Sequence, residues 1–330
     1  MNVTSRMQTL ISSTTAPNNG TNCTEIMKTR NQSVELYLLI LLICVFTFGV
    51  IFNSLAVWVF CFKMKKWTET RVFMMSLLFS DCCLLFTLPF RIYTTLHDWS
   101  NRILCNVVSF SYFMNTYMSI AVITLIAVDR FVAIKFPMKA RSLRSPKKAA
   151  MACGIIWVLY IATRLYLEFG TNLDFRSPVF CFRKVSTRPL KRILYFTVLG
   201  SCVPLVILVF CSAQIIWTLK KKEKMSVSEE KDIEKSINIV KTNLAIFLFC
   251  FLPLTIGNIV RFILESIEVN CLLLKQINDF VHIAQGLSDL NCCLDSICYY
   301  FVAKEFWEKA SLFPRFKKQL IHDQTHESSI

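Results

Sequence analysis

The sequence has few of the residues from which enzyme sites are usually built. Only 7 of its 330 residues are glycine and only 4 are histidine. It contains no phosphate-binding glycine loop, no nucleophile elbow and no His/Cys cluster with metal-ligand spacing. We therefore expect that the protein is not an enzyme. Internal repeats and helices broken near their middle, which are typical of transporters, are also absent, so a membrane transporter is only a remote alternative.

Charge is scarce as well. Charged residues make up 18% of the chain and hydrophobic residues 54%, and the mean hydropathy is +0.49, values typical of a membrane protein. The formal net charge of +15 could indicate nucleic-acid binding. However, the basic residues cluster in short segments between apolar runs, which is the pattern of membrane topology signals. No nucleic-acid partner is therefore expected.

Seven apolar runs make up most of the chain. They cover residues 35–62, 71–96, 103–135, 149–170, 191–219, 236–265 and 275–301. Each run is long enough for a helix to cross about 30 Å of hydrocarbon, and the linkers are too short for separate domains. The sequence predicts an all-α membrane protein, a seven-transmembrane helix bundle over residues 35–301.

The linkers and the two ends predict how the bundle is oriented. Linkers after the first, third and fifth runs are rich in Lys and Arg, which places them in the cytoplasm and the N-terminus outside the cell. Residues 1–34 form a polar tail that we expect to be extracellular and glycosylated. Its four Asn-x-Ser/Thr sequons are at Asn2, Asn19, Asn22 and Asn31. The tail lacks a cleavable signal pattern, so the first run is expected to act as a signal anchor.

Four of the fifteen cysteines fall at predicted outer ends, where the compartment is oxidising. We expect two disulfides there, one between Cys105 and Cys181 and one between Cys23 and Cys271. Most of the other cysteines lie within apolar runs, where a thiol behaves as a small hydrophobic group.

The third run ends in the charged pair Asp129-Arg130, after 23 uncharged residues that follow Cys105. Together with motifs on the other runs, this arrangement resembles the rhodopsin-like G-protein-coupled receptors, and the match covers all seven helices. The residues that carry the resemblance are Asn53, Asp81, Pro89, Cys105, Asp129-Arg130-Phe131, Trp157, Pro204, Cys250-Phe251-Leu252-Pro253 and Asp295-Ser296-Ile297-Cys298-Tyr299.

Four further segments narrow the resemblance. They are similar to the branch of the family with kynurenate-responsive and lysophosphatidylinositol-responsive receptors. These segments are Lys66-Trp67-Thr68-Glu69-Thr70-Arg71, residues 140–146, Phe180-Cys181-Phe182-Arg183 and residues 287–295. The resemblance implies a plasma-membrane receptor for a small organic anion, an aromatic acid of the kynurenate kind. A lysophospholipid is the alternative ligand.

The resemblance also implies roles for residues inside the bundle. An ion pair of Asp129 with Arg130 would hold the inactive state, and Arg130 would meet the G protein on activation. The switch below the ligand pocket and at the cytoplasmic side would comprise Ile120, Pro204, Phe247, Phe251 and Tyr299. A sodium-binding polar network around Asp81 would comprise Asn53, Asp81, Ser119, Asn291 and Asp295. A network held by hydrogen bonds alone, with one carboxylate protonated, is the alternative.

Four arginines near the outer ends of the helices are the candidate ligand contacts. Guanidinium groups suit a carboxylate or a phosphate, because Arg offers forked donors and keeps its charge. The four are Arg91, Arg164, Arg183 and Arg261. The alternative is that some of them reach the interface or pair with Glu168, Asp174, Glu265 or Glu268.

The C-terminal segment, residues 302–330, begins with an amphipathic stretch that resembles the short helix lying along the inner leaflet. The expected partners are the inhibitory or Rho-activating class of heterotrimeric G proteins, membrane lipid, and arrestin at a tail that contains Thr325, Ser328 and Ser329. Apart from the sodium ion, no cofactor is expected.

Overall fold

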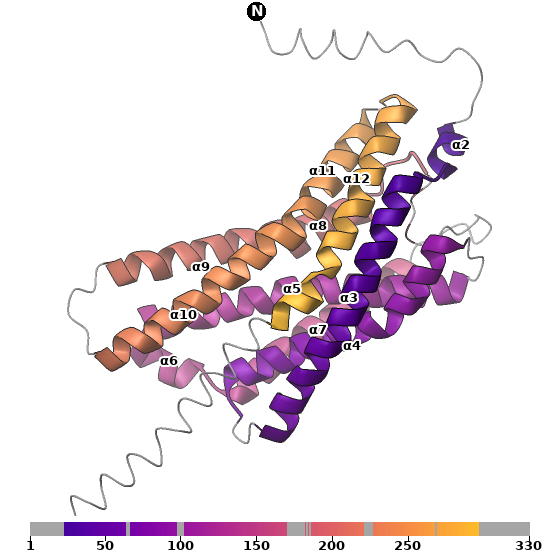
Figure 1. Ribbon diagram of the computed structural model, residues 1–330. Coiled ribbons are helices and arrows are strands. Elements are labelled where there is room, and N and C mark those ends of the chain that lie inside the picture. Colours follow the sequence, from indigo (N-terminus) through magenta and orange to yellow (C-terminus); the bar gives the residue numbers. More distant parts are fainter. Residues whose placement is uncertain are drawn as a thin grey trace, which may run out of the picture.

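The structure is a computed structural model, and it describes residues 23–63, 67–97, 102–169, 182, 184, 186–220, 227–267 and 269–296. The described part is helical and contains no strand. Seven helical columns pack side by side, and two of them bend where a π-helical segment interrupts the α-helix (Figure 1). The predicted all-α seven-helix bundle is confirmed. The amphipathic stretch after residue 301 lies outside the described residues.

Each column corresponds to one predicted apolar run. In chain order they are α3 (Gln32–Trp58) with η1 (Val59–Lys63), α4 (Glu69–Leu96), α5 (Arg102–Lys135), α7 (Pro146–Phe169), α8 (Lys191–Thr197) with η2 (Val198–Cys202) and α9 (Val203–Lys220), α10 (Val227–Ile246) with η3 (Phe247–Phe251) and α11 (Leu252–Ser266), and α12 (Cys271–Asp289). Two short helices, α2 (Cys23–Lys28) and α6 (Pro137–Leu143), lie outside the columns.

Six of the described columns are long and apolar enough to cross a membrane. The seventh, α12, is more polar because it carries Lys275, Asp279 and Asp289, and further helical turns extend it to residue 296. It begins at Cys271, four residues before the predicted run, since Asn270 caps it by accepting a hydrogen bond from the Leu273 amide at 2.9 Å.

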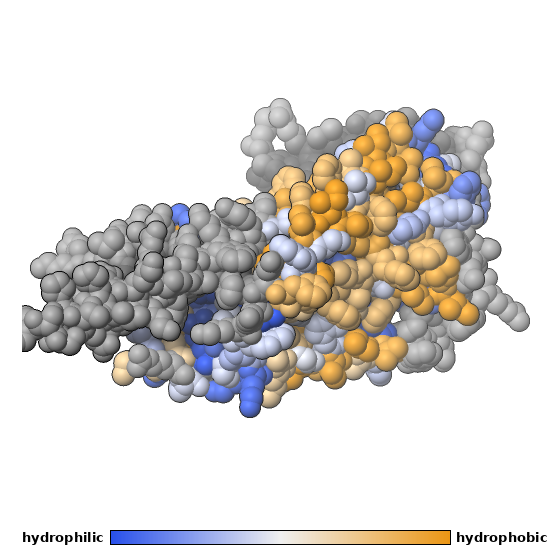
Figure 2. Space-filling model, turned by 60° about the horizontal axis from the view of Figure 1, so that its bottom comes forward, coloured by the Kyte–Doolittle hydropathy of each residue, from blue (hydrophilic) through white to orange (hydrophobic). Residues whose placement is uncertain are grey.

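The bundle is apolar on its outside as well as in its core. Large side chains such as Phe86, Ile103 and Val206 are at least two-thirds exposed, with 76%, 78% and 69% of their surface accessible. Figure 2 shows apolar side chains over a broad part of the visible face, with hydrophilic side chains in separate patches. Since several charged residues are buried instead, the arrangement suits lipid around the helices.

Two prolines account for two of the π-helical segments. Pro204 follows η2 and Pro253 follows η3, so the carbonyls four residues earlier, at Gly200 and Phe249, lie within the π segments. Proline lacks the amide hydrogen that would bind that carbonyl, and its ring pushes against it. The helix therefore widens by one residue before each proline, and such π-helical turns are frequent at functional sites.

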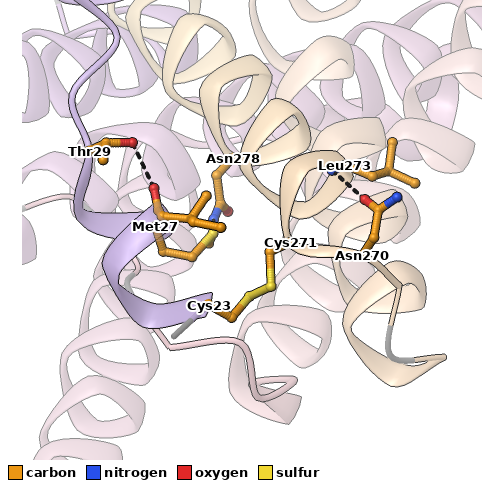
Figure 3. The surroundings of a disulfide bond; sticks show 8 residues. Cys23, Met27, Thr29, Asn270, Cys271, Leu273 and Asn278 are labelled. Atoms are coloured by element: carbon orange, nitrogen blue, oxygen red, sulfur yellow. Dashed lines mark hydrogen bonds between the residues drawn. A yellow bond between two sulfur atoms is a disulfide. The ribbon is translucent and has the colours of Figure 1, made fainter. Parts of the chain in front are cut away.

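A disulfide ties α2 to the start of α12 (Figure 3). The Cα atoms of Cys23 and Cys271 are 5.6 Å apart, and this predicted disulfide is present in the structure. Next to it, Lys275 Nζ donates to the Thr29 carbonyl at 2.9 Å and Asn278 Nδ2 contacts Met27 Sδ at 3.7 Å. The segment before α3 is thereby held across α12.

We expect Cys271→Ser to lower the melting temperature of the purified protein, because the link closes a loop with a sequence separation of 248 residues. The matched control is Cys44→Ser, which replaces an exposed free cysteine. A thermal-shift assay with and without reductant measures both variants. Equal melting temperatures for Cys271→Ser and the wild type under oxidising conditions would contradict the tethering role.

Candidate functional site

An open cleft lies at the end of the bundle that contains the Cys23–Cys271 disulfide, which we call the disulfide end. The empty volume of the cleft is about 560 Å³, part of it open to solvent. Its walls come from α3, α4, α12, the segment before α3 and Phe182, which lies between α7 and α8. The lining includes Arg30, Val34, Glu35, Leu38, Leu42, Arg91, Thr94, Phe182, Asp279 and His282. One side is apolar, and charges of both signs line the rest.

Arg91 is the buried cation of this cleft. It is 5% exposed and forms an ion pair with Asp289 on α12, which is 1% exposed. Its guanidinium carbon lies 4.6 Å from the centre of the Tyr112 ring and 4.9 Å from that of Phe182. Pairing and cation–π contacts together compensate for burying this charge. The second oxygen of Asp289, Oδ1, has no hydrogen-bond partner in the part of the chain described.

Phe182 reaches Arg91 through an unusual backbone conformation. Its φ angle is 64°, in the left-handed region that residues with a side chain seldom adopt. Its ring stands edge-on to Tyr112, with the centroids 5.7 Å apart. Strained backbone of this kind persists where the surroundings hold it and is frequent at ligand sites. Here it places an aromatic wall on the cleft.

Arg261 lies in a second charged cluster at the disulfide end. It is 7% exposed, and its Nη2 donates to Asn258 Oδ1 at 3.1 Å. The carboxylate of Glu265, one turn further along α11, has Oε1 4.0 Å from Arg261 Nε and 2.5 Å from Lys184 Nζ. Burial lowers the pKa of Lys184 to about 8, although the hydrogen bond and charge of Glu265 act in the opposite direction.

The four predicted ligand arginines are thus placed differently. Arg91 lines the cleft, whereas Arg164 and Arg261 are not among its lining residues. Arg164 is half-buried on α7 with its guanidinium carbon 5.7 Å from the centre of the Phe113 ring. Arg183 lies outside the described residues. Of the acidic partners considered for these arginines, Glu265 does lie beside Arg261.

At the opposite end of the bundle, which we call the Arg130 end, Asp129 pairs mainly with Arg144. Arg144 Nε and Nη2 donate to the two carboxylate oxygens at 2.8 and 2.9 Å. Arg130 Nε is 4.0 Å from Asp129, too far for a hydrogen bond, and Arg130 Nη2 donates to Thr70 Oγ1. The expected pair of Asp129 with Arg130 is therefore only an ion contact, because the geometry of Arg144 is better.

The Arg144 contact joins three elements. Arg144 directly follows α6, Asp129 is on α5, and Glu69 at the start of α4 lies 3.9 Å from Arg144 Nη2. A bidentate Arg–carboxylate pair is geometrically specific. The linker helix α6 is thereby fastened to the two columns that carry Arg130 and its partner Thr70.

Some of the expected switch residues lie in or directly after a π-helical segment. Phe247 and Phe251 belong to η3, are buried, and have ring centroids 5.7 Å apart in an edge-to-face arrangement. Ile120 is buried in the same apolar core. Pro204 is half-buried just after η2. Tyr299 lies outside the described residues.

Buried polar side chains lie within the bundle. All five predicted members, Asn53, Asp81, Ser119, Asn291 and Asp295, are at most 2% exposed. Asp81 accepts a hydrogen bond from Asn115 Nδ2 at 2.9 Å, and Asp295 accepts one from Asn291 Nδ2 at 2.9 Å. Asn53 Nδ2 donates to the Gly49 and Cys292 carbonyls, both at 3.0 Å.

Several oxygens of this network have no hydrogen-bond partner among the described residues. They are Asn53 Oδ1, Ser119 Oγ, Asn291 Oδ1 and Asp295 Oδ1. Carboxylate, amide and hydroxyl oxygens are the donors that a hard cation prefers, so the residues fit a sodium ion. The described residues contain no group of three or more His, Cys, Asp or Glu side chains that could hold a metal ion by themselves.

The remaining predicted sites are only partly described. Cys105 is disulfide-bonded, while its expected partner Cys181 lies outside the described residues. Asn31 is exposed, as a glycan would require, and its Nδ2 donates to Asp279 Oδ2 at 3.2 Å. Asn2, Asn19 and Asn22 lie outside the described residues.

Comparison with known proteins identifies the family to which this seven-helix bundle belongs. Residues 52–299 match the family model described as "7 transmembrane receptor (rhodopsin family)". The chain is 43% identical to G-protein coupled receptor 35 of Homo sapiens over 80% of this chain and 83% of that receptor. The chain belongs to the rhodopsin family of seven-transmembrane receptors.

Two further relatives belong to the same family. G-protein coupled receptor 35 of Mus musculus is 38% identical over 88% of this chain and 92% of that receptor. Lysophosphatidic acid receptor 4 of Mus musculus is 32% identical over 79% of this chain and 73% of that receptor. The protein is therefore a G-protein-coupled receptor and not an enzyme. As a member of this family it is a multi-pass plasma-membrane protein that acts with a small ligand and a G protein.

Sequence reasoning missed several partners of the predicted site residues. Asp289 pairs with Arg91 and Lys184 with Glu265, while Asn115 bonds Asp81 and Arg144 bonds Asp129. A signal existed for Asp289 and Asn115, since a polar group inside an apolar run needs a partner within the bundle. Lys184 and Arg144 lie in linkers, and no sequence pattern predicts where a linker residue lies in the folded protein.

Arg144→Ala should raise the ligand-independent activity of the receptor several-fold, because it releases α6 and Asp129 from each other. Nucleotide exchange on a purified G protein measures this. The control Lys139→Ala removes another cation of α6, whose Nζ lies over the Phe136 ring at 6.0 Å. If Arg144→Ala shows the same basal nucleotide exchange as the wild type, Arg144 does not restrain the receptor.

Proposed function

We propose that this receptor is activated from outside the cell by a small organic anion, an aromatic acid of the kynurenate kind. Its N-terminus and disulfide end face the extracellular side. The four arginines Arg91, Arg164, Arg183 and Arg261 supply the positive charge for the ligand. The observation that carries the proposal is Arg91, a nearly buried guanidinium stacked on two aromatic rings in the wall of an open cleft.

The cleft suits an aromatic acid chemically. A ligand ring can pack against Phe182, and its carboxylate can take the guanidinium donors of Arg91 that Asp289 leaves unused. The bidentate fork of Arg favours a planar carboxylate over a point anion. Binding would place a second anion beside Arg91, which weakens the pairing of Arg91 with Asp289 and so changes how firmly α4 is held to α12.

A lysophospholipid is the second candidate ligand, and the apolar wall of the cleft favours it. Val34, Leu38 and Leu42 of α3 lie along one side and could accept an acyl chain, with the headgroup at Arg91. The similarity to lysophosphatidic acid receptor 4 also supports this candidate. Both ligand classes share a negative group and a larger apolar part.

Signalling follows from a shift in population between two states of the bundle. An agonist can favour the open state only by the difference in its affinity for the two states. Opening at the Arg130 end would free Arg130 from Thr70 and expose it to a G protein of the inhibitory or Rho-activating class. Arrestin would then recognise the phosphorylated C-terminal tail.

The ligand proposal is tested in cells that express the chain at the surface, by challenging them separately with kynurenate and with lysophospholipids. We expect Arg91→Gln to weaken the potency of the effective class by about tenfold or more, since it removes a charge-assisted contact. The matched control is Arg188→Gln, an exposed arginine at the same end. Arg130→Ala should abolish the response.

Response of the wild type to neither class at confirmed surface expression would reject the anionic-ligand proposal. An unchanged potency in Arg91→Gln, with a response present, would instead remove this cleft from the ligand site and leave the ligand class standing.

We further propose that a sodium ion binds the buried network at Asp81 and Asp295, with Ser119, Asn53 and Asn291 nearby. The ion would neutralise part of the negative charge of two buried carboxylates and occupy oxygens that lack a hydrogen bond.

Because an ion that binds the folded receptor stabilises it, replacing choline by sodium at constant ionic strength should raise the melting temperature of the wild type. We expect Asp81→Asn to abolish this increase. The control Asp279→Asn changes a carboxylate at the disulfide end and should keep the increase. A wild type that melts at the same temperature in both salts would favour the alternative of a network held by hydrogen bonds alone.

A further inference from the structure

Both arginines in the described lining of the cleft already have a carboxylate beside them. Arg91 forms an ion pair with the buried Asp289. Arg30 Nε is 3.1 Å from Oε1 of Glu35, which lines the same cleft. An anion that enters the cleft therefore meets cations whose charge is balanced within the protein, and its own negative charge is in excess.

Asp279 adds a further negative charge to the cleft. It is half-buried on α12, and in the part of the chain that the structure describes its hydrogen bond comes from a neutral group, Asn31 Nδ2, at 3.2 Å. Lys275, one turn earlier on α12, donates to the Thr29 carbonyl at 2.9 Å. A carboxylate has about four acceptor positions on its oxygens, so Asp279 can accept further hydrogen bonds.

The charges of the described lining and its buried ion pair do not balance. The positive charges of Arg30 and Arg91 face the negative charges of Glu35, Asp279 and Asp289, and the excess is one negative charge with His282 counted as neutral. A purely anionic ligand increases this excess. A ligand that also has a cationic group does not, and its cationic group can pair with Asp279. Charges in a partly enclosed cleft interact more strongly than in bulk water.

We infer that the ligand of this cleft is a zwitterion, with its anionic group at Arg91 and an ammonium group at Asp279. The inference deepens the proposed function and rests on it, because it takes the anion at Arg91 from there. It assigns Asp279 as a ligand contact and a determinant of specificity. The ligand class is then an aromatic acid with an amine at its far end.

The two charges of this ligand lie far apart. Asp279 precedes Asp289, the partner of Arg91, by ten residues on α12, which is about 15 Å along the helix axis. Leu38 and Leu42 of α3 line the same cleft. The empty volume of about 560 Å³ is typical of small-molecule sites. An extended apolar body with one charge at each end matches this arrangement.

The experiment compares probes built on one biphenyl body. The zwitterion is 4′-(aminomethyl)biphenyl-4-carboxylic acid, the anion is 4′-(hydroxymethyl)biphenyl-4-carboxylic acid, and the cation is biphenyl-4-ylmethanamine. Their affinities are measured on the purified receptor in lipid nanodiscs. We expect the wild type to bind the zwitterion about tenfold or more tightly than the anion, because the ammonium adds a charge-assisted hydrogen bond. The 2′-(aminomethyl) isomer brings the two charges closer together and should lose most of this advantage.

Asp279→Asn removes the charge and keeps an oxygen that can accept from Asn31. This variant should bind the zwitterion and the anion with nearly equal affinity. The matched control is Glu25→Gln, which removes another carboxylate of the disulfide end, one that pairs with Lys28 at 2.7 Å. It should keep the preference of the wild type.

Asn31→Asp keeps the inference testable if Asp279→Asn folds poorly. It places a second carboxylate beside Asp279 and should increase the preference for the zwitterion several-fold. Because Asn31→Asp also removes a sequon, its control is Ser33→Ala, which removes the same sequon without adding a charge. Ser33→Ala should leave the preference unchanged.

The outcomes separate the inference from the proposed function. Equal binding of the zwitterion and the anion to the wild type, or a preference that Asp279→Asn retains, would overturn the role of Asp279 and leave the anionic ligand standing. If the cation binds as tightly as the zwitterion, the carboxylate contributes nothing, and the anionic-ligand proposal fails. Binding of none of the probes to the wild type would count against both.

Discussion

A charge within a bilayer must find its partner inside the protein, because lipid offers none. This constraint accounts for the contacts that define both ends of the receptor. Arg91 pairs with Asp289 at the disulfide end, and Asp129 pairs with Arg144 at the Arg130 end. In each case the partner lies on a different element, so a local electrostatic requirement becomes a link between helices. Apolar side chains can pack together in many arrangements of the helices, whereas these ion pairs require particular helices to be neighbours.

Such links suit a receptor because a second partner can replace the first. A ligand anion can compete with Asp289 for the charge of Arg91, and a G protein can take Arg130 from Thr70. The exchange alters the balance between two arrangements of the helices, by an amount limited to the difference in contact energy. The π-helical segments beside Pro204 and Pro253 lie between the two ends, in columns whose hydrogen-bond ladders are already interrupted. They are natural places for bending.

Hydropathy predicted the bundle well, since each column follows a predicted apolar run and six of the described columns are long and apolar enough to cross a bilayer. The buried network was also predictable in outline, because Asp81 and Asp295 stand inside apolar runs. The pairings between charged side chains were not predictable. Asp129 has Arg130 as its neighbour in sequence but bonds Arg144, since only the fold brings the end of α6 to α5. Likewise the position of Lys184 beside Glu265 depends on the path of a linker, which no periodicity describes.

The most direct test of this account is the distance between the Arg130 ends of α6 and α10 with and without agonist. Spin labels introduced through unnatural amino acids at Met138 and Lys241, both exposed, would report it by double electron–electron resonance in nanodiscs. The account predicts a shift to longer distances when agonist and G protein are both present. An unchanged distance distribution, while the agonist saturates the receptor and nucleotide exchange proceeds, would contradict it.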